Sequence, residues 1–146
     1  MTKEAFKLIY NKALDLISRR EHSRYELMQK LNKRYPETRP LIEEVLDKLI
    51  VNNILDDERF AEMYINSRAR KGFGPKKIEM ELSSKHVESF IISSSLEAYD
   101  NWIENAKKEL LKKFKGIVPT DYQSKIKQKQ FLFNRGFSIQ IIERVL

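Results

Sequence analysis

LDDERFAEMYINSRARKGFGPKKIEMEL, residues 55–82, predicts two α-helices joined by a tight turn. Acidic residues at 56–58 and basic residues within 68–71 complement the dipole at the two ends of the first helix. The Gly-Phe-Gly run at 72–74 breaks that helix, because glycine readily adopts turn conformations. Pro75 suits the first position of the next helix, where a backbone donor is not needed. This stretch therefore predicts a helical hairpin.

An apolar helix face recurs along the chain on both sides of this hairpin. The i, i+3, i+4, i+7 stripe that begins at Ile42 has counterparts beginning at Ile92 and Ile142, and Leu82 and Leu132 share the same spacing. Small and basic residues seven positions apart also recur: Ala13 with Arg20, Ala61 with Arg68, and Ala106 with Lys113. The spacing predicts a repeat of about 45 to 50 residues.

Helix-capping signals divide each repeat into three helices. Residues 23–26 (Ser-Arg-Tyr-Glu) and 120–123 (Thr-Asp-Tyr-Gln) have the spacing of capping boxes, and Gly136 suits a helix end. The helices are expected at about 3–20, 23–34, 40–53, 57–71, 75–85, 88–99, 101–115, 121–135 and 138–146.

The fold class expected from these helices is all-α, with three tandem three-helix repeats stacked into an elongated, bent rod. The expected units are residues 1–54, 55–99 and 100–146. A unit of this size buries too little surface to be stable alone, so neighbouring units should pack end to end. A compact bundle is the alternative.

The composition favours a polyanionic partner or an acidic protein surface. Lys and Arg number 28 against 21 Asp and Glu, which gives a formal net charge of +7. A basic surface without such a partner is the alternative. The chain has no cysteine, which excludes disulfides and thiolate metal sites. The N-terminal segment does not resemble a signal peptide and no apolar run reaches the ~20 residues of a membrane span, so we expect a cytoplasmic protein.

Neither catalysis nor metal binding is expected. His22 and His86 have no metal-type partner at helical spacing, and His22 is better explained as a contact at a helix junction. Asp56, Asp57 and Glu58 point in different directions at a helix start, which favours capping over carboxylate chemistry. No phosphate-binding loop, nucleophile elbow or zinc-protease motif is present. We therefore expect a non-enzymatic protein without catalytic residues, metal or cofactor.

Basic residues gather in clusters. Five cations flank the Gly-Phe-Gly turn without counter-charges in that stretch, which suggests an anionic partner. Phe73 within the turn could stack on a base or enter a protein pocket, or it could fold back and staple two helices. Lys108 and Lys112 lie opposite the apolar face of the 101–115 helix, where they could follow a phosphate backbone, meet acidic groups or be solvated.

Three segments resemble the RecX family of recombination regulators: Arg20 to Leu31, Leu55 to Leu82, and Phe131 to Leu146. The resemblance extends from Ala13 to Leu146, although residues 85–110 match only in helical pattern. It implies three tandem three-helix repeats and a regulator in DNA repair, recombination and the SOS response. Such a protein binds the RecA–DNA filament and inhibits its extension, ATP hydrolysis and strand exchange. The residues expected to contact the filament or DNA are Arg20, Arg24, Arg68, Arg70, Lys71, Lys76, Lys77, Lys108, Lys112 and Arg135.

The expected partners are the RecA filament and, through weak electrostatic contacts, single- or double-stranded DNA. The protein is expected to act as a monomer, and no membrane association is expected. Two other functions stay open on sequence alone. One is a stand-alone DNA-binding module that uses a three-helix unit like a helix-turn-helix, although no Asn, Gln and Arg cluster is aimed at base edges. The other is a protein-interaction scaffold whose DNA affinity is incidental.

Overall fold

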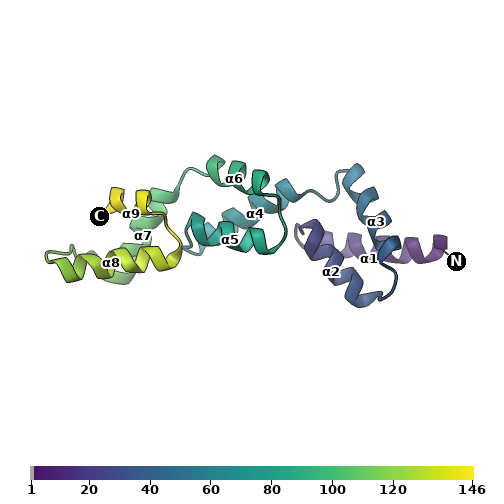
Figure 1. Cartoon of the computed structure of the whole chain (residues 1–146), viewed down its shortest axis with the longest axis horizontal. Helices are drawn as coiled ribbons and strands as arrows, with labels where there is room; N and C mark the ends of the chain where they lie inside the picture. Colours follow the sequence, from purple (N-terminus) through teal and green to yellow (C-terminus); the bar gives the residue numbers. More distant parts are fainter. Residues whose placement is uncertain (1) are drawn as a thin grey trace.

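The computed structural model describes residues 2–146, which form nine α-helices and no strand. The helices are α1 (Thr2–Arg19), α2 (Arg24–Arg34), α3 (Arg39–Val51), α4 (Asp57–Arg70), α5 (Pro75–Ser84), α6 (Ser89–Ala98), α7 (Trp102–Phe114), α8 (Tyr122–Arg135) and α9 (Ile139–Val145). Every helix begins and ends within two residues of its expected position. The molecule is elongated, with the chain ends near its opposite extremes (Figure 1). The expected all-α rod of three tandem three-helix units is confirmed.

Each group of three helices encloses its own hydrophobic core. The first core lies among α1–α3, the second among α4–α6 and the third among α7–α9, with Trp102 packed against both the second and the third. The residues that repeat in the sequence are the buried ones: Ala13, Ala61 and Ala106 on the first helices, Leu31, Leu82 and Leu132 on the second, and Ile42, Ile92 and Ile142 on the third. The periodicity therefore marks three similar cores.

The caps explain where most helices begin and end. Ser23 forms the expected capping box with Glu26, and Gly136 ends α8 in the left-handed conformation at φ 100°. The expected box beginning at Thr120 is wrong. Asp121 is the N-cap of α8 instead, and its Oδ1 accepts the Ser124 amide at 2.7 Å. A carboxylate one residue later in the chain thus takes over the cap.

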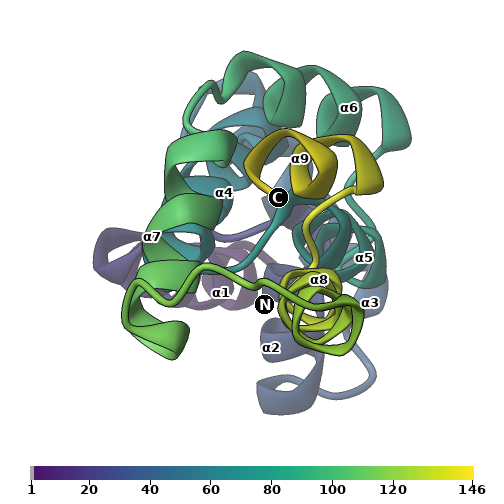
Figure 2. The same cartoon turned by 90° about the vertical axis from the view of Figure 1, so that its left-hand side faces the viewer.

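The second and third units join where the C-terminus of α8 meets the N-terminus of α5. The Gly74 amide donates to the Arg135 carbonyl at 2.8 Å, and the Lys76 amide donates to the Gly136 carbonyl at 2.8 Å. Helix ends leave amides and carbonyls without intrahelical partners, and here the two ends satisfy each other with their dipoles aligned. Figure 2 looks along the molecule from the third unit and shows α8 end-on beside α5.

The first and second units meet in a comparable way at the other end of α5. The Ser23 hydroxyl donates to the Lys85 carbonyl at 3.4 Å, just beyond the last residue of α5, and the Arg24 amide donates to Asp57 Oδ1 at 2.8 Å. The Tyr25 and His86 rings stack with centroids 3.7 Å apart. The second helices therefore follow one another as a column in the order α8, α5, α2 (Figure 1).

Candidate functional site

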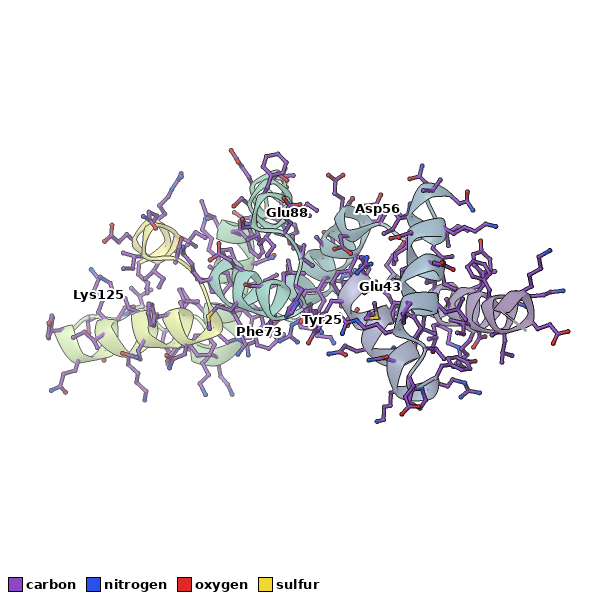
Figure 3. All side chains as sticks on the ribbon, turned by 45° about the vertical axis from the view of Figure 1, so that its right-hand side comes forward. Tyr25, Glu43, Asp56, Phe73, Glu88 and Lys125 are labelled. Carbon is purple, nitrogen blue, oxygen red and sulfur yellow. The ribbon has the colours of Figure 1, made fainter. Side chains whose placement is uncertain are left out.

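The Phe73 ring lies among three cations where the second and third units meet. The guanidinium carbons of Arg68 and Arg135 are 4.0 and 4.6 Å from the ring centroid, and Lys77 Nζ is 5.0 Å from it. The ring is half-buried and packs against the second core. Cations at such distances are attracted to the ring face. Of the two interpretations of Phe73, the structure favours the residue that folds back and staples helices. Figure 3 shows where Phe73 lies, near the meeting of the second and third units.

Arg68 has a counter-charge that the sequence did not reveal. Its Nε and Nη2 donate to the two Glu81 carboxylate oxygens at 2.9 and 2.8 Å, and the Tyr64 hydroxyl donates to the same group at 2.9 Å. Burial alone would raise the pKa of Glu81, but the hydrogen bonds from Arg68 and Tyr64 outweigh it and lower that pKa. Burial, together with the bond to Glu81, raises the pKa of Tyr64 to about 12. The expectation of a cluster without counter-charges is therefore wrong for Arg68.

Arg135 closes the same junction from the third unit. Its Nη2 donates to Glu109 Oε1 at 2.8 Å and to the Lys71 carbonyl at 3.2 Å. Glu109 is buried, and its carboxylate fills the space that a side chain at Gly72 would need. Glu109 was not among the expected site residues, although its place three residues after the core residue Ala106 puts it near the buried face of that helix.

Arg20 and Arg24 lie at the other junction, away from Phe73. Arg20 Nη1 is 3.2 Å from Glu26 Oε1, and Arg24 Nη2 is 3.8 Å from Asp47 Oδ1. Lys85 Nζ reaches the second Glu26 oxygen at 3.2 Å, so Glu26 joins both units. Burial would raise the pKa of Glu26, but hydrogen bonds from Arg20, the Ser23 amide and Lys85 lower it. Figure 3 shows Tyr25 at this junction.

His22 is a contact at a helix junction, as expected. It is buried, with Nδ1 3.0 Å from the Arg20 carbonyl and Nε2 2.8 Å from Lys30 Nζ. This arrangement suits a neutral ring that donates from Nδ1 and accepts at Nε2. Burial lowers the pKa of His22, and the positive charges of Arg20 and Lys30 act in the same direction.

The acidic residues at the start of α4 also act structurally. Asp56 Oδ1 accepts the amides of Glu58 and Arg59 at 2.8 and 3.4 Å, which confirms the capping interpretation. Asp57 accepts the Arg24 amide, and burial raises its pKa. In residues 2–146 no group of three His, Cys, Asp or Glu side chains is placed to hold a metal ion.

Six of the expected contact residues are exposed, and all of these except Arg20 lack a carboxylate within 4.0 Å among the described residues. The five without a carboxylate partner are Arg70, Lys71, Lys76, Lys108 and Lys112. Lys71 and Lys76 flank the turn that contains Phe73, while Lys108 and Lys112 lie on α7. Arg20, Arg24, Arg68 and Arg135 are in ion pairs, and Lys77 lies against Phe73. The structure thus separates cations without a carboxylate partner from cations whose charge is engaged by a carboxylate or by the Phe73 ring. Of the second group, Arg135 also reaches the neighbouring unit, through the Lys71 carbonyl.

These features define a three-unit helical-repeat protein with ion-paired junctions and a basic surface. Residues 10–49, 56–96 and 100–146 match, respectively, the first, second and third three-helix domains of RecX. The chain belongs to the RecX family of regulatory proteins. Among its described residues no helix is both long and apolar enough to cross a membrane.

Individual RecX proteins are similar to this chain over nearly its whole length. Regulatory protein RecX of Pseudomonas fluorescens (strain SBW25) is 38% identical over 135 residues, which cover 92% of this chain and 86% of that protein. RecX of Pseudomonas syringae pv. tomato is 37% identical over 137 residues. The crystal structure of RecX from Lactobacillus salivarius has a TM-score of 0.83, 26% identity, and coverage of 98% of this chain and 95% of that chain.

Proposed function

We propose that the protein binds the RecA–DNA filament and restrains it, inhibiting filament extension, ATP hydrolysis and strand exchange. The observation that carries this proposal is the set of solvent-facing cations, which recurs on an elongated protein of the RecX family. Linked basic surfaces can contact several protomers at once, and each contact raises the effective concentration of the next. The same proposal makes the protein a cytoplasmic monomer with weak, electrostatic affinity for DNA.

Within this proposal the ten basic residues have two roles. Arg70, Lys71 and Lys76 at the turn, with Lys108 and Lys112 on α7, make direct contacts to acidic protein groups or phosphates because their charges face solvent. The paired arginines and Lys77 stabilise the helices around those charges, and they are contact residues only through their remaining exposed atoms. The elements that carry the direct contacts, α4, α5 and α7, belong to the second and third units.

The test is inhibition of the RecA ATPase on single-stranded DNA at substoichiometric amounts of this protein. Reversing three charges in Arg70→Glu, Lys71→Glu, Lys76→Glu should raise the half-inhibitory concentration by roughly tenfold or more, equivalent to about 1.4 kcal/mol. A control with Lys3→Glu, Lys7→Glu, Lys33→Glu changes the net charge equally at exposed positions of the first unit. Inhibition that appears only when the protein saturates bare DNA would replace the proposal with simple competition for DNA.

A salt titration separates the filament proposal from the stand-alone DNA-binding module. Binding carried by about six or more phosphate contacts should weaken by roughly 10³-fold between 50 and 200 mM salt. We expect binding to the filament to be less sensitive than binding to bare DNA, because protein contacts do not release condensed counterions. Equal slopes for both would favour the DNA-binding module.

A further inference from the structure

An apolar groove lies on the outer side of α5, α8 and α9. Its larger part is a hollow of about 830 Å³ lined by Met80, Phe133 and Ile139 among others, and their exposed fractions are 72%, 58% and 60%. A second hollow of about 230 Å³ shares Phe133 and Ile139 and extends the groove to Ile126. A contiguous group of exposed apolar side chains marks an interaction site on a soluble protein more often than scattered apolar side chains do.

The groove is not needed to close the third core. On α8 the core is formed through Leu132, and on α9 through Ile142, with Phe137 between the two helices. Phe133 and Ile139 belong to a second apolar stripe on these helices, which faces solvent. Since the third unit already has its core, this stripe has no partner within the described residues.

The charges around the groove favour an acidic occupant. Lys76 and Lys77 line its larger part and Lys129 its smaller part, whereas Glu81 at the same edge is already paired with Arg68 at 2.8 Å. Glu143 is the remaining carboxylate in the lining. The groove is also continuous with the proposed interface, because Lys76 belongs to both.

The floor of the groove favours protein over nucleic acid. Three of its four exposed apolar side chains, Met80, Ile126 and Ile139, are aliphatic. Single-stranded nucleic acid binds along successive aromatic rings, and here Phe133 is the one exposed ring. A hollow of this volume can take side chains of a short segment, and its lysines can pair with carboxylates beside them.

We infer that this groove is the docking site for an acidic segment of the filament protein that carries aliphatic or aromatic anchors. This inference rests on the proposed function. It adds which surface of the protein contacts the filament protein rather than DNA. Met80, Phe133 and Ile139 receive the anchors, and Lys76, Lys77 and Lys129 pair with the acidic side chains. The exposed cations outside the groove then serve phosphates and other acidic groups.

Photo-crosslinking from the groove tests the assignment directly. A benzophenone amino acid replaces Phe133 in the full chain, and a matched control replaces Phe90, which is 72% exposed on α6. With assembled RecA–DNA filaments, position 133 should give adducts with RecA that map to an acidic stretch with apolar residues, and position 90 should give few. Adducts mainly with DNA, with a second copy of this chain, or equally from both positions would overturn the inference.

A pair of variants separates this inference from the proposed function. Phe133→Ser with Ile139→Ser should raise the half-inhibitory concentration by roughly tenfold or more, as loss of a central apolar anchor does at protein interfaces. Its affinity for bare single-stranded DNA should match that of wild type, and Phe90→Ser should inhibit normally. Unchanged inhibition by the double variant would remove the groove from the interface while the filament proposal stands. If wild type itself does not inhibit, the proposed function fails instead.

Discussion

Gly74 shows how much depends on one missing side chain. Its backbone is extended, at φ −92° and ψ 171°, so any residue could adopt its conformation. A Cβ at this position would nevertheless overlap the backbone of Gly136 and Phe137. Glycine is required here because the two helix ends approach too closely to leave room for a side chain. Its backbone conformation alone would allow any residue.

We predict that Gly74→Ala lowers the free energy of unfolding by about 2–3 kcal/mol, which is the upper part of the range for overpacked sites. Gly116→Ala is the control: its φ of 81° imposes strain of about 1 kcal/mol, but the nearest atom to a new Cβ is the flexible Leu111 side chain at 3.6 Å. Urea denaturation measures both. A Gly74→Ala variant no less stable than Gly116→Ala would show that the helix ends can move apart at little cost.

His22 makes stability depend on pH near neutrality. Its pKa is lowered in the folded protein, so the unfolded chain binds more protons below the ordinary value of 6.5. The stability associated with the neutral ring is therefore complete above pH 6.5 and is lost as the pH falls through the folded pKa. The pKa values of Glu26 and Glu81 are lowered from the ordinary value of 4.5, so these groups titrate below this window.

We predict that the melting temperature of the wild type falls between pH 7.5 and pH 6 and that His22→Gln falls less over the same range. His86→Gln provides a matched control, since His86 is exposed and is not among the groups that shift the pKa of His22. Thermal melts followed by circular dichroism at constant ionic strength measure the slopes. Parallel slopes for wild type and His22→Gln would contradict the assignment.

At the scale of helices, the ion pair between Arg135 on α8 and Glu109 on α7 joins two helices of the third unit. Arg135 also donates to the Lys71 carbonyl beyond the end of α4. We predict that Arg135→Met costs about 1–3 kcal/mol, because it leaves the buried Glu109 carboxylate without its partner. Adding Glu109→Gln should recover part of that loss in a double-mutant cycle followed by denaturation. Strictly additive losses would mean that the pair does not couple the helices.

The elements themselves could be predicted from sequence because helix formation is local. Spacings of three and four residues mark the buried faces, and Pro75 and Gly136 mark helix ends through their own backbone chemistry. Tertiary partners are different. Nothing near Arg68 in the chain identifies Glu81, which lies on the next helix, as its partner, so the sequence predicted cations without counter-charges around Phe73. The pairing of Glu109 with Arg135 on another helix is likewise not marked in the sequence, although the spacing from Ala106 places Glu109 near the buried face.

Surface features were the least predictable. Phe133 lies next to the fully buried core residue Leu132 in sequence, yet it is 58% exposed. The exposed groove therefore has no signature that distinguishes it from a core stripe. The basic residues were predicted as one class, although packing divides them into cations with a carboxylate or aromatic partner and cations without one.

Across the whole molecule, the three cores are joined by narrow junctions. The junction between the first and second units consists largely of polar contacts, including Arg59 Nε with Glu21 at 3.1 Å and Arg59 Nη1 and Nη2 with the carbonyls of Asn53 and Ile54. Trp102, the only tryptophan, packs against the second and third cores instead. In repeat proteins stability is close to a sum of unit and interface terms, so weakening one junction should uncouple the units on its two sides.

We predict that wild-type unfolding in urea gives coincident transitions by tryptophan fluorescence and far-ultraviolet circular dichroism. In Arg59→Ala, the dichroism should show an additional early transition that fluorescence does not follow, because the first unit then unfolds separately from the units that contact Trp102. Arg39→Ala is the control, since Arg39 pairs with Glu43 at 3.3 Å on the exposed face of one helix, away from the junction. Coincident transitions in Arg59→Ala would show that stacking at the junction, through contacts such as Tyr25 on His86, is sufficient to couple the units without this arginine.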